Sequence, residues 1–242
     1  MKSQFDELPR LYEEMADWPF RSCMEIPNVL ALLGNVTHRD VLDFGCGNGM
    51  YSRWLREAGA SRVVGYDVSD GMLHYAKRRE EKDKLGIEYT SRLDASHEAK
   101  FDKVLAVYVI PYADTRQALL EMCEAMARVL RPGGQLVALP IHPEYHRNPA
   151  YYEPYGLRMT PEGPDIDGGK IRLDLILPPY DASVRAFYWG KDTLERAMLG
   201  AGFKLVQWVQ PGLPNEPEDD ESNRFMRDYW LKPHAAIMNC QR

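Results

Sequence analysis

The chain has 242 residues, 45% of them hydrophobic and 27% charged, which is ordinary for one soluble globular domain. Its net charge is −6, and its densest basic run, residues 77–79, is followed directly by the acid-rich run 80–83, so we expect no groove for nucleic acid. No apolar run approaches the roughly 18 residues of a membrane span, and the acidic N-terminus does not resemble a secretory signal, so we expect a cytoplasmic protein without membrane contact.

In chain order, the first predicted elements are short helices over residues 5–33, interrupted at prolines. Strands and helices then alternate over residues 36–141. The predicted strands are 40–44, 62–67, 87–93, 101–110 and 135–140, and the predicted helices between them are 49–59, 69–86 and 115–134. This alternation predicts an α/β fold with a doubly wound, Rossmann-like, mostly parallel sheet that has helices on both faces and a ligand crevice at the carboxyl ends of its strands.

After residue 141 the pattern changes. Two strand-like runs, 170–177 and 183–189, lie in a segment rich in Pro, Gly and Tyr and predict an inserted hairpin. A helix and two further strands follow, which brings the predicted sheet to seven strands. We therefore expect a single domain, 1–242, in four parts. They are an N-terminal helical lid (1–35), a cofactor-binding core (36–141), a cap with the hairpin (142–190), and the C-terminal helix and strands (191–242).

The segment VLDFGCGNGMY, residues 41–51, has glycines at three alternate positions between a strand and a helix: Gly45, Gly47 and Gly49. Without Cβ atoms the backbone can turn sharply and let a ligand lie against it, next to the free N–H groups of the helix. A phosphate-binding P-loop would need Gly-Lys followed by Ser or Thr, which this turn lacks. A dinucleotide loop would need glycine where Met50 stands. S-adenosylmethionine (SAM), which carries no phosphate, is the third candidate.

Two acids flank the glycine turn. Asp67 ends the second strand, about 20 residues beyond the turn, where a carboxylate accepts hydrogen bonds from ribose hydroxyls in many nucleotide sites, those for NAD included. Asp43 precedes the glycines, and we expect it to orient the loop or to meet the cationic methionyl end of SAM. A carboxylate is unfavourable beside a pyrophosphate and favourable beside an ammonium group, so Asp43 favours SAM.

Together these motifs resemble those of the class I SAM-dependent methyltransferases. The matching segments, in order, are VLDFGCGNG, VVGYDVSDGML, FDKVLAVYVI and VLRPGGQLVAL. The flanking segments ADWPFRSCMEIP and FYWGKDTLERAMLGAGF are similar to bacterial small-molecule methyltransferases of the toxoflavin N-methyltransferase type. The resemblance implies an enzyme that uses SAM, releases S-adenosylhomocysteine (SAH) and acts on a small metabolite, as a monomer or a homodimer.

The resemblance also implies which residues hold the cofactor. Backbone atoms of Gly45, Cys46 and Gly47 would line the methionyl portion, and Asp67 would hold the ribose. Tyr108, at the end of the fourth strand, would stand where the methyl group meets the substrate. On the same basis we assign it to both the cofactor site and the catalytic site.

Further residues would bind the adenine. By the family pattern, Val68 and Met72 would contact its two faces, and the Asp94 carboxylate would accept a hydrogen bond from its amino group. The Ala95 N–H would donate to the ring. These four residues follow the second and third predicted strands, whose carboxyl ends meet at one edge of a parallel sheet.

The N-terminal segment would close over the cofactor through Tyr12 and Arg21. The family pattern pairs Arg21 with the methionyl carboxylate of SAM. A local alternative is an ion pair with Glu25, four residues further along a helical segment. The sequence favours the two interpretations about equally.

Aromatic residues crowd the cap and follow the fourth strand. Tyr152, Tyr188 and Trp189 are our candidates for substrate contacts, and Tyr112 is a candidate for the site of methyl transfer. An aromatic pocket would suit a planar or cationic molecule, with cation–π contacts worth ~0.5–2 kcal/mol each. The alternative is that most of these side chains pack the hairpin itself.

His142 follows the fifth strand, where the crevice should open, and is a candidate general base or substrate partner. A histidine facing solvent in a loop is the alternative. His146 lies four residues further on, but Glu144 is at the wrong offset for the H-E-x-x-H pattern. The cysteines are scattered as well, so we expect no metal.

The sequence does not identify the atom that accepts the methyl group. Nitrogen in a small metabolite is the preferred acceptor, and methylation of carbon or oxygen is the alternative, since His142 as a base would suit acceptors that must lose a proton. A SAM-binding cyclase or regulatory protein that transfers no methyl group is an alternative from another class. Such a protein would keep the glycines and Asp67 without opening a pocket beside the methyl group.

Overall fold

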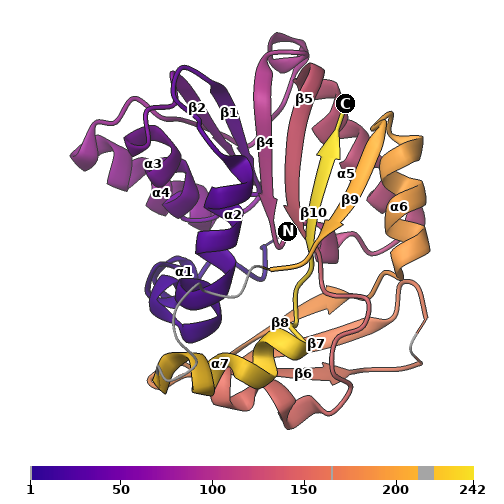
Figure 1. The fold of residues 1–242 in the computed structure, drawn as a ribbon. Coiled ribbons are helices and arrows are strands. Elements are labelled where there is room, and N and C mark those ends of the chain that lie inside the picture. Colours follow the sequence, from indigo (N-terminus) through magenta and orange to yellow (C-terminus); the bar gives the residue numbers. More distant parts are fainter. Residues whose placement is uncertain (1, 165, 212–220) are drawn as a thin grey trace.

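The computed structural model describes residues 2–164, 166–211 and 221–242, whose elements are shown in Figure 1. The strands of its central sheet are β1 (Asp40–Phe44), β2 (Arg62–Tyr66), β3 (Glu88–Thr90), β4 (Phe101–Val107), β5 (Leu130–Leu139), β9 (Leu205–Val209) and β10 (Ile237–Gln241). They lie in the order β3-β2-β1-β4-β5-β10-β9. The first five are parallel to one another, and β10 is antiparallel to both β5 and β9. The predicted seven-stranded, mostly parallel sheet is confirmed.

Helices cover both faces of this sheet (Figure 1). The α-helices of the described residues are α1 (Pro9–Glu14), α2 (Ile26–Leu33), α3 (Met50–Glu57), α4 (Asp70–Asp83), α5 (Arg116–Val129), α6 (Lys191–Gly200) and α7 (Glu221–Leu231), of which α2 to α6 lie on this sheet. One buried cluster packs α2, α3 and α4 against one face, and a second packs α5 and α6 against the other. The sheet is therefore covered on both sides, as a parallel sheet requires.

The strand order places a switch point beside β1. From β1 the chain proceeds outward through β2 to β3, and then returns to the other side of β1 to form β4. At the centre of β4, Val104, Leu105 and Ala106 are fully buried, in line with its continuous apolar run. The loops that follow β1 and β4 lead in opposite directions and leave a crevice at the carboxyl ends of these strands.

A second, antiparallel sheet lies beyond the carboxyl ends of the parallel strands (Figure 1). Its strands are β6 (Leu157–Pro161), β7 (Lys170–Leu175) and β8 (Ala182–Phe187). The last two form the predicted hairpin. The sequence did not predict β6, because its few residues stand in a stretch rich in Pro and Gly. A third buried cluster joins this sheet to the N-terminal segment and α7.

The prolines of the N-terminal segment differ in effect: α1 begins at Pro9, as expected, whereas helical chain continues through Pro27. Pro9 and Pro27 lie in the first turns of α1 and α2, where a missing N–H has no partner to lose. Between these helices the chain forms a π-helical turn, Arg21–Glu25, a rare conformation that often occurs at functional sites. In the part of the chain that the structure describes, no helix is both long and apolar enough to cross a membrane.

Candidate active site

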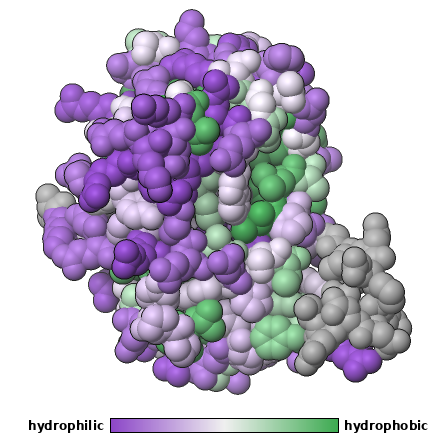
Figure 2. Space-filling model, turned by 90° about the vertical axis from the view of Figure 1, so that its left-hand side faces the viewer, coloured by the Kyte–Doolittle hydropathy of each residue, from purple (hydrophilic) through white to green (hydrophobic). Residues whose placement is uncertain are grey.

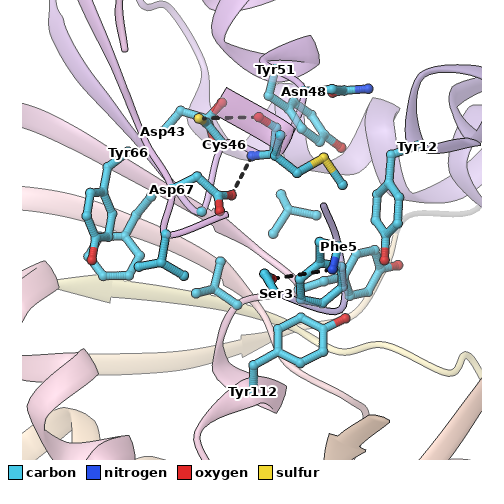
Figure 3. A pocket seen from close by; sticks show the side chains of 18 of the residues that line it. Ser3, Phe5, Tyr12, Asp43, Cys46, Asn48, Tyr51, Tyr66, Asp67 and Tyr112 are labelled. Carbon is cyan, nitrogen blue, oxygen red and sulfur yellow. Dashed lines mark hydrogen bonds between the residues drawn. The ribbon is translucent and has the colours of Figure 1, made fainter. Parts of the chain in front are cut away.

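A cavity of about 470 Å³ lies at the carboxyl ends of β1, β2 and β4, at the switch point of the sheet (Figure 3). Its walls include residues 43–48, 66–68 and 107–109, which are the last residues of β1, β2 and β4 and the residues that follow them. The helix α5 and the N-terminal segment complete it. This volume falls in the range of pockets that enclose cofactors and drug-sized ligands.

The turn after β1 requires glycine at position 45. Gly45 has a φ of 76°, in the left-handed region, and a Cβ there would lie 2.3 Å from Cγ2 of Val109. The N–H groups of Gly45 and Cys46 both donate to the carbonyl of Tyr66, at 2.7 and 2.9 Å. The loop is thus attached to the end of β2, and its backbone forms part of the cavity wall.

Asp67 fixes the loop from the neighbouring strand. Its Oδ2 accepts a hydrogen bond from the Gly47 N–H at 2.7 Å, drawn as a dashed line in Figure 3, and its Oδ1 accepts one from the Ser69 N–H at 2.8 Å. Burial raises the pKa of Asp67. Each carboxylate oxygen has two lone pairs, so Asp67 keeps acceptor capacity for hydroxyl groups of a ligand in the cavity.

Asp43 lies at the base of the same loop and is 2% exposed. Its Oδ2 accepts a hydrogen bond from the Ser52 hydroxyl at 2.6 Å. Burial raises the pKa of Asp43 to about 7. A cation in the cavity would favour the charged form of this carboxyl group and lower its pKa again.

The wall beyond Asp67 is apolar. Val68 and Met72 both line the cavity, and Val68 is 71% exposed, an unusual state for a valine at the rim of a pocket. Figure 2 shows a hydrophobic strip between hydrophilic regions on the side of the molecule that faces left in Figure 1. An apolar or aromatic ligand surface placed against Val68 would remove it from water.

Asp94 and Ala95 lie outside the cavity lining. The Asp94 carboxylate instead caps a 3₁₀ turn, Ala95–His97, and accepts hydrogen bonds from the N–H and hydroxyl groups of Ser96 at 2.9 and 2.6 Å. The structure therefore does not bring these two residues to the other candidate cofactor residues. Their contact with adenine stays a prediction.

The opposite end of the cavity is aromatic. Tyr12, Tyr108 and Tyr112 line it together with Phe5, whose ring lies edge-on to that of Tyr112 with 4.8 Å between centroids (Figure 3). Burial raises the pKa of Tyr12 to about 12 and raises that of Tyr112 well above its ordinary value. These phenols stay protonated near neutral pH and can orient a ligand, but they are poor proton acceptors.

Arg21 forms the local ion pair. Its Nη2 lies 2.9 Å from Oε1 of Glu25, and the two side chains are 5% and 0% exposed. Arg21 also lines the cavity, so its contact with a cofactor carboxylate stays a prediction beside the observed pair. The sequence pointed to Glu25 only as a partner for Arg21. Its burial depends on packing between distant segments.

Two cavity residues near the N-terminus, Ser3 and Phe5, were not foreseen. The backbone that carries them is held by Asp6, whose Oδ1 accepts from the Ser69 hydroxyl at 2.7 Å and from the Gly71 N–H at 3.2 Å. A Cβ on Gly71 would lie 2.0 Å from the carbonyl oxygen of Asp6. No short motif in the sequence signals this contact, because it joins residues more than 60 positions apart.

The three cap aromatics proposed as substrate contacts do not line the cavity. Tyr152 is fully buried, and its hydroxyl accepts from the His146 N–H at 2.8 Å. The Tyr188 hydroxyl and the Trp189 indole N–H each donate to a main-chain carbonyl at 3.1 Å. Their polar atoms are satisfied by the protein itself, so in this structure they pack the cap, as in the alternative interpretation.

His142, the candidate base, also lies outside the cavity lining. Its Nδ1 accepts a hydrogen bond from the Glu144 N–H at 3.0 Å, and its main-chain N–H donates to the carbonyl of His234 at 2.8 Å. Burial lowers the pKa of His142. The ring is engaged in its own loop, and a catalytic role for it stays a prediction.

Comparison with known proteins shows which proteins this part of the chain resembles. Residues 41–134 match the family model described as a methyltransferase domain. This match contains the glycine turn, β2 with Asp67, and β4 with Tyr108.

Curated relatives include proteins that act on two kinds of acceptor atom. An uncharacterized protein of Haemophilus influenzae is 29% identical over 88% of this chain and 87% of its own length. N-demethylindolmycin N-methyltransferase of Streptomyces griseus is 26% identical over 43% of this chain and 45% of its own length. Ubiquinone biosynthesis O-methyltransferase of Alkalilimnicola ehrlichii is 26% identical over 58% of each chain. The chain thus spans about half the length of these two named enzymes.

Solved structures share the fold at low sequence identity. A SAM-dependent methyltransferase of Mesorhizobium loti has a TM-score of 0.61 at 21% identity, over 94% of this chain and 100% of its own. An amino pentose methyltransferase of Micromonospora echinaspora, solved with SAM bound, has a TM-score of 0.61 at 17% identity, over 100% of this chain and 92% of its own.

The fold, the cavity and the domain match are thus similar to those of class I SAM-dependent methyltransferases. The domain match supports a transferase enzyme, and solved structures that share the fold include SAM-dependent methyltransferases. The residues present fit SAM, since the cavity combines an open glycine backbone, a carboxylate with free acceptor capacity at Asp67 and an exposed apolar surface at Val68.

Proposed function

We propose that this enzyme transfers the methyl group of SAM to a small-molecule acceptor and that the acceptor atom is nitrogen. One observation carries the proposal, the charge of the cavity wall. Among the described residues that line it, the charged side chains are Arg21, Asp43, Asp67 and Glu121, and Arg21 is already paired with Glu25. The acids are therefore in excess, which favours an acceptor molecule that is neutral or carries a cationic group elsewhere over one with a phosphate or carboxylate, while the nitrogen that attacks is unprotonated.

Each cofactor residue has a role in this proposal. Gly45 and Gly47 let the methionyl portion lie against the backbone, and Asp67 holds the ribose hydroxyls with its remaining lone pairs. Val68 and Met72 cover the adenine. SAM supplies a sulfonium methyl group, and the protein's task is to align the acceptor with it.

A nitrogen acceptor suits the groups at the aromatic end. An amine that reaches the cavity in its neutral form attacks without a base, and alignment at roughly 3–3.5 Å does much of the catalytic work. Tyr108 and Tyr112, the aromatic residues nearest the end of β4, are protonated phenols with strongly raised pKa values. They can accept a hydrogen bond from an N–H group and can contact a cationic product through their rings.

Other acceptors and functions are the competing proposals. A carbon or oxygen acceptor needs a base, and His142 is the candidate that would have to turn toward the cavity. The named relatives include both an N- and an O-methyltransferase. A SAM-binding protein without transferase activity is disfavoured by the matched domain and by the open aromatic end of the cavity. The resemblance to toxoflavin-type enzymes stays a prediction.

The decisive experiment uses SAM labelled in its methyl group. The purified protein is incubated with labelled SAM and the small-molecule fraction of a bacterial extract, and the labelled products are separated and identified by mass spectrometry and NMR. We expect label on the nitrogen of a neutral or cationic metabolite. Label on a carboxylate or phosphate ester, or on carbon or oxygen, contradicts the nitrogen proposal. Calorimetric binding of SAH, with no binding of NADH or ATP, checks the cofactor independently.

A further inference from the structure

Glu25 is a fully buried carboxylate with donors from three separate elements. Its Oε1 accepts hydrogen bonds from Arg21 Nε at 3.0 Å and from the Tyr51 hydroxyl on α3 at 2.9 Å. Its Oε2 accepts one from the hydroxyl of Tyr108, after β4, at 2.6 Å. A carboxylate at 0% exposure is costly unless it is paired and hydrogen-bonded. Here the three partners that satisfy it all line the cavity.

Tyr108 needs outside support for its conformation. Its φ is 57°. For a residue with a bulky side chain this left-handed conformation costs about 1–3 kcal/mol, so it persists only where the surrounding structure fixes it. Its N–H donates to the Leu139 carbonyl at 3.1 Å, and its ring stacks on His234 with 5.4 Å between centroids. Within the described residues, the bond to Glu25 is the hydrogen bond that fixes its hydroxyl.

The direction of these hydrogen bonds is fixed. Burial, with the charge of Glu25 as the next cause, raises the pKa of Tyr51 and of Tyr108 well above the ordinary value. Both phenols therefore remain protonated near neutral pH and act as donors to the carboxylate. Arg21 in turn forms an ion pair with the same carboxylate, and its guanidinium lies 5.9 Å from the centre of the Tyr108 ring.

We infer that Glu25 is a positioning residue for methyl transfer: it fixes Tyr108 at the methyl end of the cavity, and it withholds Arg21 from the cofactor. The inference rests on the proposed function, because it takes the end of β4 as the place of transfer. It also assigns a role to the π-helical turn, since this turn places Arg21 in the cavity wall and Glu25 in contact with three residues of that wall. If Glu25 were merely structural, its substitution would weaken folding and cofactor affinity together. A positioning role instead predicts that its substitution lowers the rate of methyl transfer without lowering the affinity for SAH.

The test compares E25Q, Y108F and the double variant. The initial rate of label transfer from methyl-labelled SAM to the small-molecule extract is measured at saturating SAM, and the Kd of SAH is measured by calorimetry. We expect each single variant to lower the rate at least tenfold. For E25Q we expect SAH to bind equally or up to about threefold more tightly, because Arg21 is released toward its carboxylate. The double variant should be no slower than the slower single variant, because both changes remove one interaction.

Two controls keep the test decisive. Y51F removes the other phenol from the same carboxylate and leaves Tyr108 bonded, so its rate should fall less than fivefold. If E25Q folds poorly, as thermal unfolding would show, the variant R21M/E25Q removes both charges of the buried pair and avoids an uncompensated cation; its rate should fall as for Y108F. Multiplicative losses in the double variant, or a loss of SAH affinity in E25Q parallel to the loss of rate, overturn the inference. A wild-type protein that neither binds SAH nor transfers label overturns the proposed function and the inference with it.

Discussion

The two ends of the cavity differ in how they are built. At the cofactor end, main-chain N–H groups of the glycine turn donate hydrogen bonds to the Asp67 carboxylate and to the end of the neighbouring strand β2. At the aromatic end, Phe5 comes from the N-terminal segment, Tyr108 and Tyr112 follow β4, and contacts between side chains distant in the sequence, such as that of Phe5 with Tyr112, hold them together. The first end depends on backbone geometry and the second on packing. Substitutions should therefore damage cofactor binding at one end, and the alignment of the acceptor at the other.

The largest effect on SAH affinity is expected from G45A. The new Cβ would strain a φ of 76° and lie 2.3 Å from Val109 Cγ2, at a cost to stability of about 2–4 kcal/mol. Calorimetry should show SAH affinity reduced more than ~100-fold, because the displaced loop forms the cavity wall. G133A is the matched control: its φ is 78°, but nothing lies within 4 Å of its Cβ. Equal loss of SAH affinity in both variants would contradict the proposed role of this close contact.

The next effect is expected from D67N. An asparagine offers one acceptor oxygen instead of two, so the Gly47 or Ser69 N–H group loses its partner and the charge is removed. We expect SAH affinity to fall roughly 30-fold, the range for a lost charge-assisted hydrogen bond. D102N is the control, since Asp102 also accepts a main-chain N–H, that of Asp40 at 2.9 Å, but does not line the cavity. An unchanged Kd in D67N would argue against the ribose role.

A pH series should give a smaller effect, centred on Asp43. Because burial raises its pKa to about 7, its charged form appears only as the pH rises through that value. If it meets the ammonium group of the cofactor, SAH affinity should increase about tenfold from pH 5.5 to 7.5. The stability of the free protein should fall as the pH rises from about 4 to about 7 and level off above, because over this range Asp43 is ionised in the unfolded chain and protonated in the folded one. D43N should flatten both curves; a pH dependence that persists in D43N would assign it to another group.

The smallest effect is expected from W189F and Y152F in the cap. Each removes a hydrogen bond or packing contact inside the protein, so unfolding should become easier by about 1–3 kcal/mol. The Kd of SAH and the rate of label transfer should change less than about twofold, because neither side chain lines the cavity. A rate loss of tenfold or more without loss of stability would restore these aromatics as substrate contacts.

The same contrast explains what could be predicted from the sequence. The sheet and the place of the glycine turn follow from local patterns: apolar strands, glycines at positions of positive φ, and an acid at the end of β2. Tyr152 and Trp189 were predicted from composition alone, and composition does not say whether an aromatic ring faces a cavity or a core. Glu25 and Ser3 carry no local signature, because their positions depend on contacts that only the folded chain brings together.

The place of β10 in the sheet has a consequence for how the protein is made. It is the last strand in the sequence, yet it lies between β5 and β9 and pairs with both. During synthesis, β9 therefore has no partner until residues 237–241 have left the ribosome. Until then the edges of β5 and β9 are open to pairing with other chains, and nascent polypeptides that stall before this point should be the ones that chaperones retain.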